Sequence, residues 1–148
     1  MDVSLRTTGL KRRSLRLEPL RERVRVMMRY MSLPAETEIS VLLCGDALIQ
    51  VLNREHRGLD KPTDVLAFAM QEAPLGGGRP EILGDIVISV ETARRQALDQ
   101  KRSLLTETTT LLAHGLLHLL GYDHQTPTEA RRMFARQDLL VAAARPPR

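Results

Sequence analysis

Residues 106–124 have the sequence TETTTLLAHGLLHLLGYDH, which decides the expected fold and holds three of the chain's four histidines. Residues 106–120 are apolar on most sides, so they are predicted to form the central, buried helix. On a helical wheel, four leucines point nearly opposite to His114 and His118. These leucines are Leu105, Leu112, Leu116 and Leu119. One side of this helix is therefore predicted to pack on a sheet, while the other side lines a cleft.

The spacing of the three histidines predicts a metal site. His114 and His118 are four residues apart, so both rings leave the same helix face one turn apart. Gly121 provides a helix stop, because glycine adopts the left-handed conformation easily, and the chain can then bring His124 back toward the pair. Three neutral imidazoles with an open fourth position are typical of catalytic zinc. We therefore predict that His114, His118 and His124 bind one Zn²⁺ per chain.

Two acidic residues accompany the histidines. Asp123 is predicted to stabilise the turn or to orient a ring through a hydrogen bond, with metal ligation as a further alternative. Glu107 lies two turns before His114 on the same face, and is predicted to hydrogen-bond near the metal site or to be solvated. Metalloprotease helices carry a general-base glutamate directly after the first histidine. Gly115 occupies that position here, which disfavours a peptidase.

The other segments predict a mixture of strands and helices. Strands are expected in short runs rich in apolar residues, at residues 3–7 (an edge strand), 37–43, 64–69 and 83–89. Helices are expected at residues 19–31, 91–100 and 127–144, and from Asp46, as the cap, through Leu52. Loops are expected at residues 54–63 and 73–80, with a frayed end at residues 145–148. The fold class is therefore α+β, with a small mixed sheet of about four strands, about five packed helices and the histidine-bearing helix central.

Length and composition indicate one folded domain over residues 1–148, since 43% of the residues are hydrophobic. No apolar run approaches the roughly 20 residues that span a bilayer. The N-terminal stretch is polar and lacks the apolar core of a signal peptide. Cys44, the single cysteine, is expected to be a small buried hydrophobic residue. We therefore expect a cytoplasmic protein with no membrane partner and no small-molecule cofactor.

The charge distribution points toward polyanions. The net charge is +4, and nine of the first 29 residues are Lys or Arg. Such a segment indicates contact with nucleic acid, although a solvated helix face is the alternative. The chain has no tryptophan and 3% aromatic residues, so a base-stacking surface is not expected. Arg57, in the predicted polar loop, is a candidate for binding phosphate oxygens through its planar guanidinium.

Three blocks of the chain resemble the YbeY family of bacterial endoribonucleases. They are LNREHRGLDKPTDVLAF at residues 52–68, LGDIVIS at 83–89 and HGLLHLLGYDH at 114–124. The last block matches the family signature H-G-x-L-H-L-x-G-Y-D-H at every fixed position. The chain departs from the family at His56, where Tyr is usual, and around Phe68, where Ala-Phe-Ala replaces Ser-Phe-Pro. These departures concern contacts with substrate more than the metal site.

The resemblance implies that His114, His118 and His124 are the zinc ligands, and that Arg57 acts with His114 in catalysis. It implies metal-dependent cleavage of single-stranded RNA, in 16S ribosomal RNA 3′-end maturation and ribosome quality control. Expected partners are ribosomal RNA, the small ribosomal subunit and its assembly factors. The nucleophile is water or the ribose 2′-hydroxyl. The alternatives are a noncatalytic ribosome-assembly factor with structural zinc and a metallopeptidase.

Overall fold

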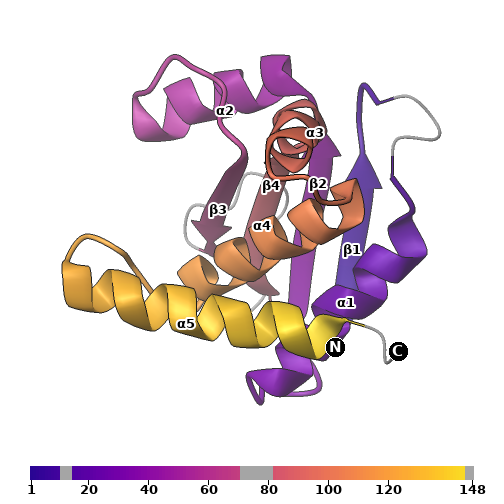
Figure 1. The fold of residues 1–148 in the computed structure, drawn as a ribbon, viewed down its shortest axis with the longest axis vertical. Helices are drawn as coiled ribbons and strands as arrows, with labels where there is room; N and C mark the ends of the chain where they lie inside the picture. Colours follow the sequence, from indigo (N-terminus) through magenta and orange to yellow (C-terminus); the bar gives the residue numbers. More distant parts are fainter. Residues whose placement is uncertain (11–14, 71–81, 146–148) are drawn as a thin grey trace.

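The computed structural model describes residues 1–10, 15–70 and 82–145, which form four strands and five helices (Figure 1). The strands are β1 (Asp2–Thr7), β2 (Glu38–Cys44), β3 (Val65–Ala69) and β4 (Ile82–Ser89). The helices are α1 (Leu17–Tyr30), α2 (Asp46–Arg57), α3 (Val90–Asp99), α4 (Leu104–Leu119) and α5 (Pro127–Ala144). The predicted α+β fold is confirmed. The loop predicted at residues 73–80 lies outside the described residues.

The four strands form one mixed sheet in the order β1-β2-β4-β3. Strands β1, β2 and β4 are parallel, whereas β3 pairs with β4 in the antiparallel direction. The central strand β4 is buried along nearly its whole length, as expected for a strand covered on both faces. Strand β3 lies at the edge of the described sheet, so only one of its edges pairs with a strand. Residues of β3 and of α4 line the same pocket.

Side-chain alternation along the strands separates two hydrophobic clusters. In β4, Ile86 and Ile88 belong to the large core beneath α1, α3, α4 and α5, which cover one face of the sheet (Figure 1). Val87 points to the other face and joins Phe68 of β3 and Ile49 of α2 in a smaller cluster. Helix α2 is thereby held over the β3 end of the sheet, which places its last turn close to β3.

Helix α4 is central, as predicted, and Leu112 and Leu116 are fully buried in the large core. Its last turn closes with two hydrogen bonds, from the Gly121 N–H to the His118 carbonyl and from the Tyr122 N–H to the Leu117 carbonyl. Gly121 has φ +95°, the left-handed conformation that this C-terminal motif requires. The predicted helix stop at Gly121 is confirmed.

The prediction that Asp46 caps α2 is wrong. Gly45 is the N-cap residue, and the Asp46 N–H donates a hydrogen bond to Glu91 Oε1 of α3 at 2.8 Å. The Asp46 carboxylate instead accepts hydrogen bonds from the hydroxyls of Ser89 and Thr92, each at 2.6 Å. The starts of α2 and α3 therefore stabilise each other, because each helix offers a carboxylate to the other's first turn.

The prediction of a loop over residues 54–63 is wrong in its first half. Helix α2 continues through Arg57, and Gly58 ends it with φ +72°. The last turn is entirely polar and exposed, so its sequence lacks the apolar periodicity that marks a helix. The following loop is tied back by the buried Asn53, whose amide donates to the Lys61 carbonyl at 2.9 Å.

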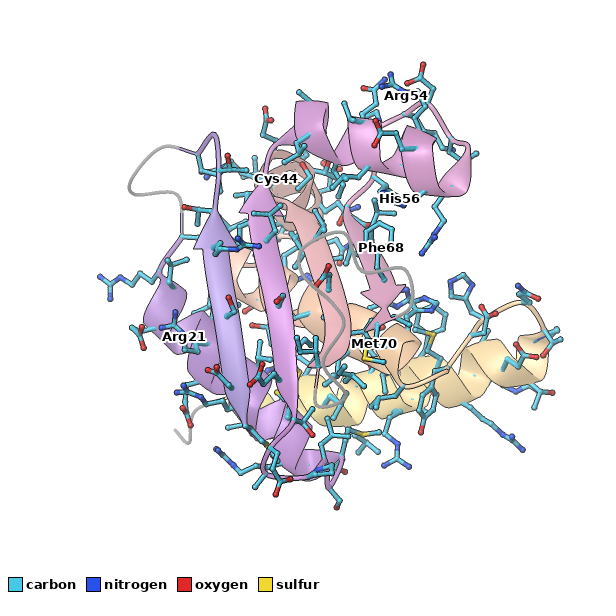
Figure 2. All side chains as sticks on the ribbon, turned by 180° about the vertical axis from the view of Figure 1, so that it is seen from behind. Arg21, Cys44, Arg54, His56, Phe68 and Met70 are labelled. Carbon is cyan, nitrogen blue, oxygen red and sulfur yellow. The ribbon has the colours of Figure 1, made fainter. Side chains whose placement is uncertain are left out.

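The basic residues of α1 are largely paired within their own helix. The pairs are Arg21–Glu18, Arg25–Glu22 and Arg29–Glu22. In Figure 2, Arg21 lies near the β1 edge of the sheet, whereas His56 lies near the opposite edge, beside β3. Residues 11–13, which carry three more of the basic side chains, are outside the described residues. Nucleic-acid contact by this segment stays a prediction.

Cys44 is fully buried at the end of β2, as predicted, and its Sγ lies 3.5 Å from the Ile88 carbonyl oxygen. Burial, helped by the negative charge of Asp46, raises the pKa of the Cys44 thiol to about 11. The thiol therefore stays protonated at neutral pH.

Across the described part of the chain, no helix combines the length and apolar character needed to cross a membrane.

Candidate metal centre

The structure brings the three predicted histidines together. His114 and His118 project from one face of α4, and their Nε2 atoms are 3.1 Å apart. One ring nitrogen from each of His114, His118 and His124 lies within 4.8 Å of the other two. Two imidazole nitrogens on one tetrahedral zinc lie about 3.3 Å apart, given Zn–N bonds of about 2.0–2.1 Å. The three side chains therefore fit a single metal ion of this size.

The turn after α4 delivers the third histidine. After Gly121 reverses the chain, Asp123 Oδ1 accepts the backbone N–H of His124 at 2.7 Å. The His124 ring then lies 5.4 Å from the His118 ring, centroid to centroid. Asp123 thus makes a contact that stabilises the turn, and its carboxylate is not part of the histidine group.

Burial and the neighbouring imidazole rings lower the pKa of one of the three histidines. The pKa of His118 is lowered chiefly by burial, and then by the nearby His114 and His124 rings. The carboxylate of Asp123 and a backbone hydrogen bond with Tyr122 oppose this shift without reversing it. A neutral imidazole is the form that binds a metal ion, so the site is prepared for binding at neutral pH.

The histidines line one side of a pocket of about 430 Å³. Gly115 lies with them on the α4 side, and residues 63–67 together with Ala69 form the facing wall. Arg57 completes the lining from the end of α2. The pocket is therefore the space between the exposed edge of β3 and the histidine face of α4.

Arg57 is held in place by β3. Its Nη2 donates to the Ala67 carbonyl at 2.9 Å, and its Cζ lies 4.8 Å from the centre of the Phe68 ring. His56 contacts the same ring edge-on, with 5.0 Å between ring centroids, and Figure 2 shows this pair between α2 and the sheet. His56 therefore packs as an aromatic residue would, and it is not part of the histidine group.

Glu107 lies apart from the pocket. It is 2% exposed, which excludes the predicted solvated state, and its Oε2 accepts Arg102 Nε at 2.6 Å. It precedes His114 by seven residues, or about 10 Å along a helix axis. Glu107 is therefore a buried ion-pair partner of Arg102 in the first turn of α4.

Two residues of α5 contact the histidines and were missed by the sequence analysis. Gln137 Oε1 lies 2.8 Å from Nδ1 of His114. The Phe134 ring lies nearly parallel to the His124 ring, at 18° and 6.4 Å between centroids. The available sequence signal was the spacing of the polar Gln137, four residues after the buried Met133. That signal does not say which helix the amide contacts.

Known proteins are similar to this chain in sequence and in fold. The family described as "Endoribonuclease YbeY" matches residues 9–145. The protein of that name from Anaeromyxobacter sp. (strain Fw109-5) is 52% identical over 74% of this chain and 59% of its own length. The one from Geobacillus thermodenitrificans is 41% identical over 84% of each chain, and the one from Shouchella clausii is 40% identical over 95% of this chain and 93% of its own.

A solved structure agrees with these sequence matches. The solution structure of TM1509 from Thermotoga maritima superposes with a TM-score of 0.66 and 26% identity, over 96% of this chain and 88% of that one. The family match covers β2, β3 and β4 of the sheet, the histidine face of α4 and all of α5. The chain therefore belongs to the YbeY family of endoribonucleases.

Proposed function

We propose that this protein is a zinc-dependent endoribonuclease that cuts single-stranded RNA in the pocket between α4 and β3. The observation that carries the proposal is the lining of one pocket by Arg57 and by three histidines spaced to hold a metal ion. A phosphodiester entering this pocket would meet positive charge from the metal held by the histidines and from Arg57. Family membership supports the reaction class, because the relatives described above are named endoribonucleases.

His114, His118 and His124 would hold the metal through neutral imidazoles. When bound, the metal supplies Lewis-acid chemistry, because it keeps its full double positive charge among neutral ligands. Imidazole ligands also suit copper and nickel, so the metal content of the purified protein identifies the ion. The Gly115 position carries no side chain that could serve as the general base of a peptidase, which supports a nuclease over that alternative.

Arg57 would bind the non-bridging phosphate oxygens and stabilise the negative charge that grows on them during cleavage. The carbonyl of Ala67 and the ring of Phe68 orient its guanidinium before substrate binds. Such orientation reduces the reorganisation needed in the transition state. A guanidinium placed in this way can act by charge and hydrogen bonding alone, without transferring a proton.

The nucleophile is either water or the neighbouring ribose 2′-hydroxyl. The two routes leave different ends on the product: a 2′,3′-cyclic phosphate means attack by the 2′-hydroxyl, and a 5′-phosphate means attack by water. Mass spectrometry of the cleaved fragments distinguishes them.

We further propose that residues 1–148 act as one nuclease domain in the cytoplasm, on the 3′ end of 16S ribosomal RNA and in ribosome quality control. The partners would be the small ribosomal subunit and its assembly factors. The net charge of +4 supports an RNA substrate. Depletion of the protein in its host should lead to 16S precursors with unprocessed 3′ ends, measured by sequencing of RNA termini. Normal 3′ ends after depletion would contradict this role.

The activity itself is tested with purified, zinc-loaded protein and a single-stranded RNA beside a duplex of the same sequence. Cleavage of the single strand should disappear with a chelator and in His118→Ala and Arg57→Ala. Arg54→Ala is the matched control, because Arg54 lies on α2, exposed, and does not line the pocket. Cleavage that survives both site substitutions would overturn the proposal. Intact RNA with metal-replete protein, together with unfolding of His114→Ala, would indicate a structural zinc instead.

A further inference from the structure

Gln137 occupies a position on α5 where an apolar side chain is expected. The buried residues Met133, Leu140 and Ala144 mark the face of α5 that packs on the core. Gln137 lies four residues after Met133 and three before Leu140, so it shares that face. Gln137 is partly buried, and its amide makes a hydrogen bond on that side of the helix. The partner that the fold provides is a metal-site histidine.

The hydrogen bond selects one form of the His114 ring. Gln137 Oε1 lies 2.8 Å from His114 Nδ1, and an amide oxygen can only accept. Nδ1 must therefore carry a proton, so the nitrogen that His114 can offer to a metal ion is Nε2. That Nε2 is the atom 3.1 Å from Nε2 of His118, inside the histidine group. The contact with Gln137 thus presents the metal-binding nitrogen of His114 to the site.

A second side chain of α5 limits the rotation of the same ring. Phe134 precedes Gln137 by three residues, which places both on one side of the helix. The Phe134 ring lies 6.2 Å from the His114 ring, centroid to centroid, at an interplanar angle of 27°. His114 is therefore contacted from α5 both at its Nδ1 edge and along its face.

We propose that Gln137 is a positioning residue of the metal centre, which holds His114 in the Nδ1–H tautomer with Nε2 directed at the metal. This role rests on the proposed use of the three histidines as ligands. Partners of this kind fix the orientation of metal-binding histidines, and their loss typically lowers metal affinity about 10-fold to 100-fold. Helix α5, which contributes no ligand, is thereby made part of the site.

Two substitutions separate this role from simple packing. Gln137→Leu keeps a side chain of similar size in the apolar stripe but removes the acceptor. Gln137→Glu keeps an oxygen that accepts from Nδ1–H. Asp138→Ala is the control, because Asp138 is the neighbouring residue on the exposed side of α5. A merely structural role predicts the reverse order, with Gln137→Leu tolerated and Gln137→Glu harmful.

The first measurement is the tautomer of His114 in metal-free protein, from two-bond ¹H–¹⁵N spectra of the imidazole rings. Wild type, Gln137→Glu and Asp138→Ala should show the Nδ1–H form, and Gln137→Leu should show a mixture. The second is zinc affinity, by competition with a chromophoric chelator. Gln137→Leu should lose about 10-fold to 100-fold, while Gln137→Glu and Asp138→Ala stay within about threefold of wild type.

An unchanged tautomer and an unchanged zinc affinity in Gln137→Leu would overturn the positioning role, as would a loss of affinity in Gln137→Glu equal to that in Gln137→Leu. Failure of the proposed function gives a different result: wild-type protein would then bind zinc without cleaving RNA, while His114 still showed the Nδ1–H form and Gln137→Leu still lost zinc affinity. The two inferences therefore fail separately.

Discussion

Gly115 of α4 packs directly against the side chain of Ile86 in β4. A Cβ added at Gly115 would lie 2.9 Å from Ile86 Cγ2 and 3.1 Å from its Cδ1. The absence of a side chain at residue 115 therefore allows the histidine-bearing helix to approach the sheet closely. The same residue lines the pocket, so this approach also sets the distance between the histidines and β3.

Gly115→Ala is expected to destabilise the protein. Alanine favours a helix over glycine by about 1 kcal/mol, but overpacking a core contact typically costs about 1–3 kcal/mol. We expect a net loss of up to about 2 kcal/mol in the free energy of unfolding, measured by urea titration. In an Ile86→Ala background the space is available, so the same substitution should stabilise the protein. A destabilising effect of equal size in both backgrounds would contradict the packing explanation.

Arg57→Lys should impair cleavage nearly as much as Arg57→Ala. Lysine keeps the charge but lacks the planar group that lies over Phe68 and donates to the Ala67 carbonyl. Loss of an oriented donor to a developing oxyanion typically lowers kcat by roughly 100-fold to 1000-fold. Single-turnover cleavage of RNA checks this, with Arg54→Lys as the control on the same helix. Near wild-type activity in Arg57→Lys would show that charge alone is sufficient.

Asp46 should make the fold sensitive to strong acid. Burial acts to raise its pKa, but hydrogen bonds from Ser89, Thr92 and Arg95 outweigh burial, and the pKa is lowered from its ordinary value. A lowered folded-state pKa stabilises the protein above the unfolded value, about 3.9, and this contribution is lost as the pH falls through the lower folded value.

Replacement of this carboxylate by an amide tests the relationship. Asp46→Asn should cost about 1–3 kcal/mol near pH 7, since hydrogen bonds to a charged group are lost. The difference from wild type should shrink as the pH falls below about 4, measured by urea unfolding at several pH values. Asp60→Asn, at an exposed position, should change stability by less than about 0.5 kcal/mol. A difference for Asp46→Asn that stays constant down to pH 2 would contradict the account.

Cys44 should be unreactive until the protein unfolds. Its pKa of about 11 leaves little thiolate at pH 8, and its side chain is fully buried. An aromatic disulfide reagent should therefore modify native protein far more slowly than urea-unfolded protein. The raised pKa also predicts that stability falls between about pH 9 and pH 11, because the unfolded chain releases the thiol proton first. Cys44→Ala should remove that slope, and rapid modification of native protein would contradict burial.

Much of the fold was predictable because it depends on local patterns. The helix predicted at residues 106–120 is α4 (Leu104–Leu119), and each of the four predicted strands is present within about two residues at either end. These segments carry their own apolar periodicity. The last turn of α2 was not predictable in this way, because its residues are polar and exposed and gain their helical state by continuation from Ile49, which is anchored in the core.

The core of the metal site also followed from local geometry. Histidines four residues apart on a helix must share a face, and a glycine in the left-handed conformation must turn the chain back, so His114, His118 and His124 converge without reference to other segments. The distances among them agree with that expectation. Sequence alone therefore indicated which three histidines come together, and their use as metal ligands stays a prediction.

The surroundings of the ligands depend on packing between distant segments. Arg57 reaches the pocket because α2 is held over β3, and Gln137 reaches His114 because α5 packs on α4. Gly115 is required because Ile86 lies beneath it. Such contacts are set by how helices and strands pack in three dimensions, and spacing along the chain carries no information about them. The tertiary structure therefore decided which side chains contact the histidines and which one faces them across the pocket.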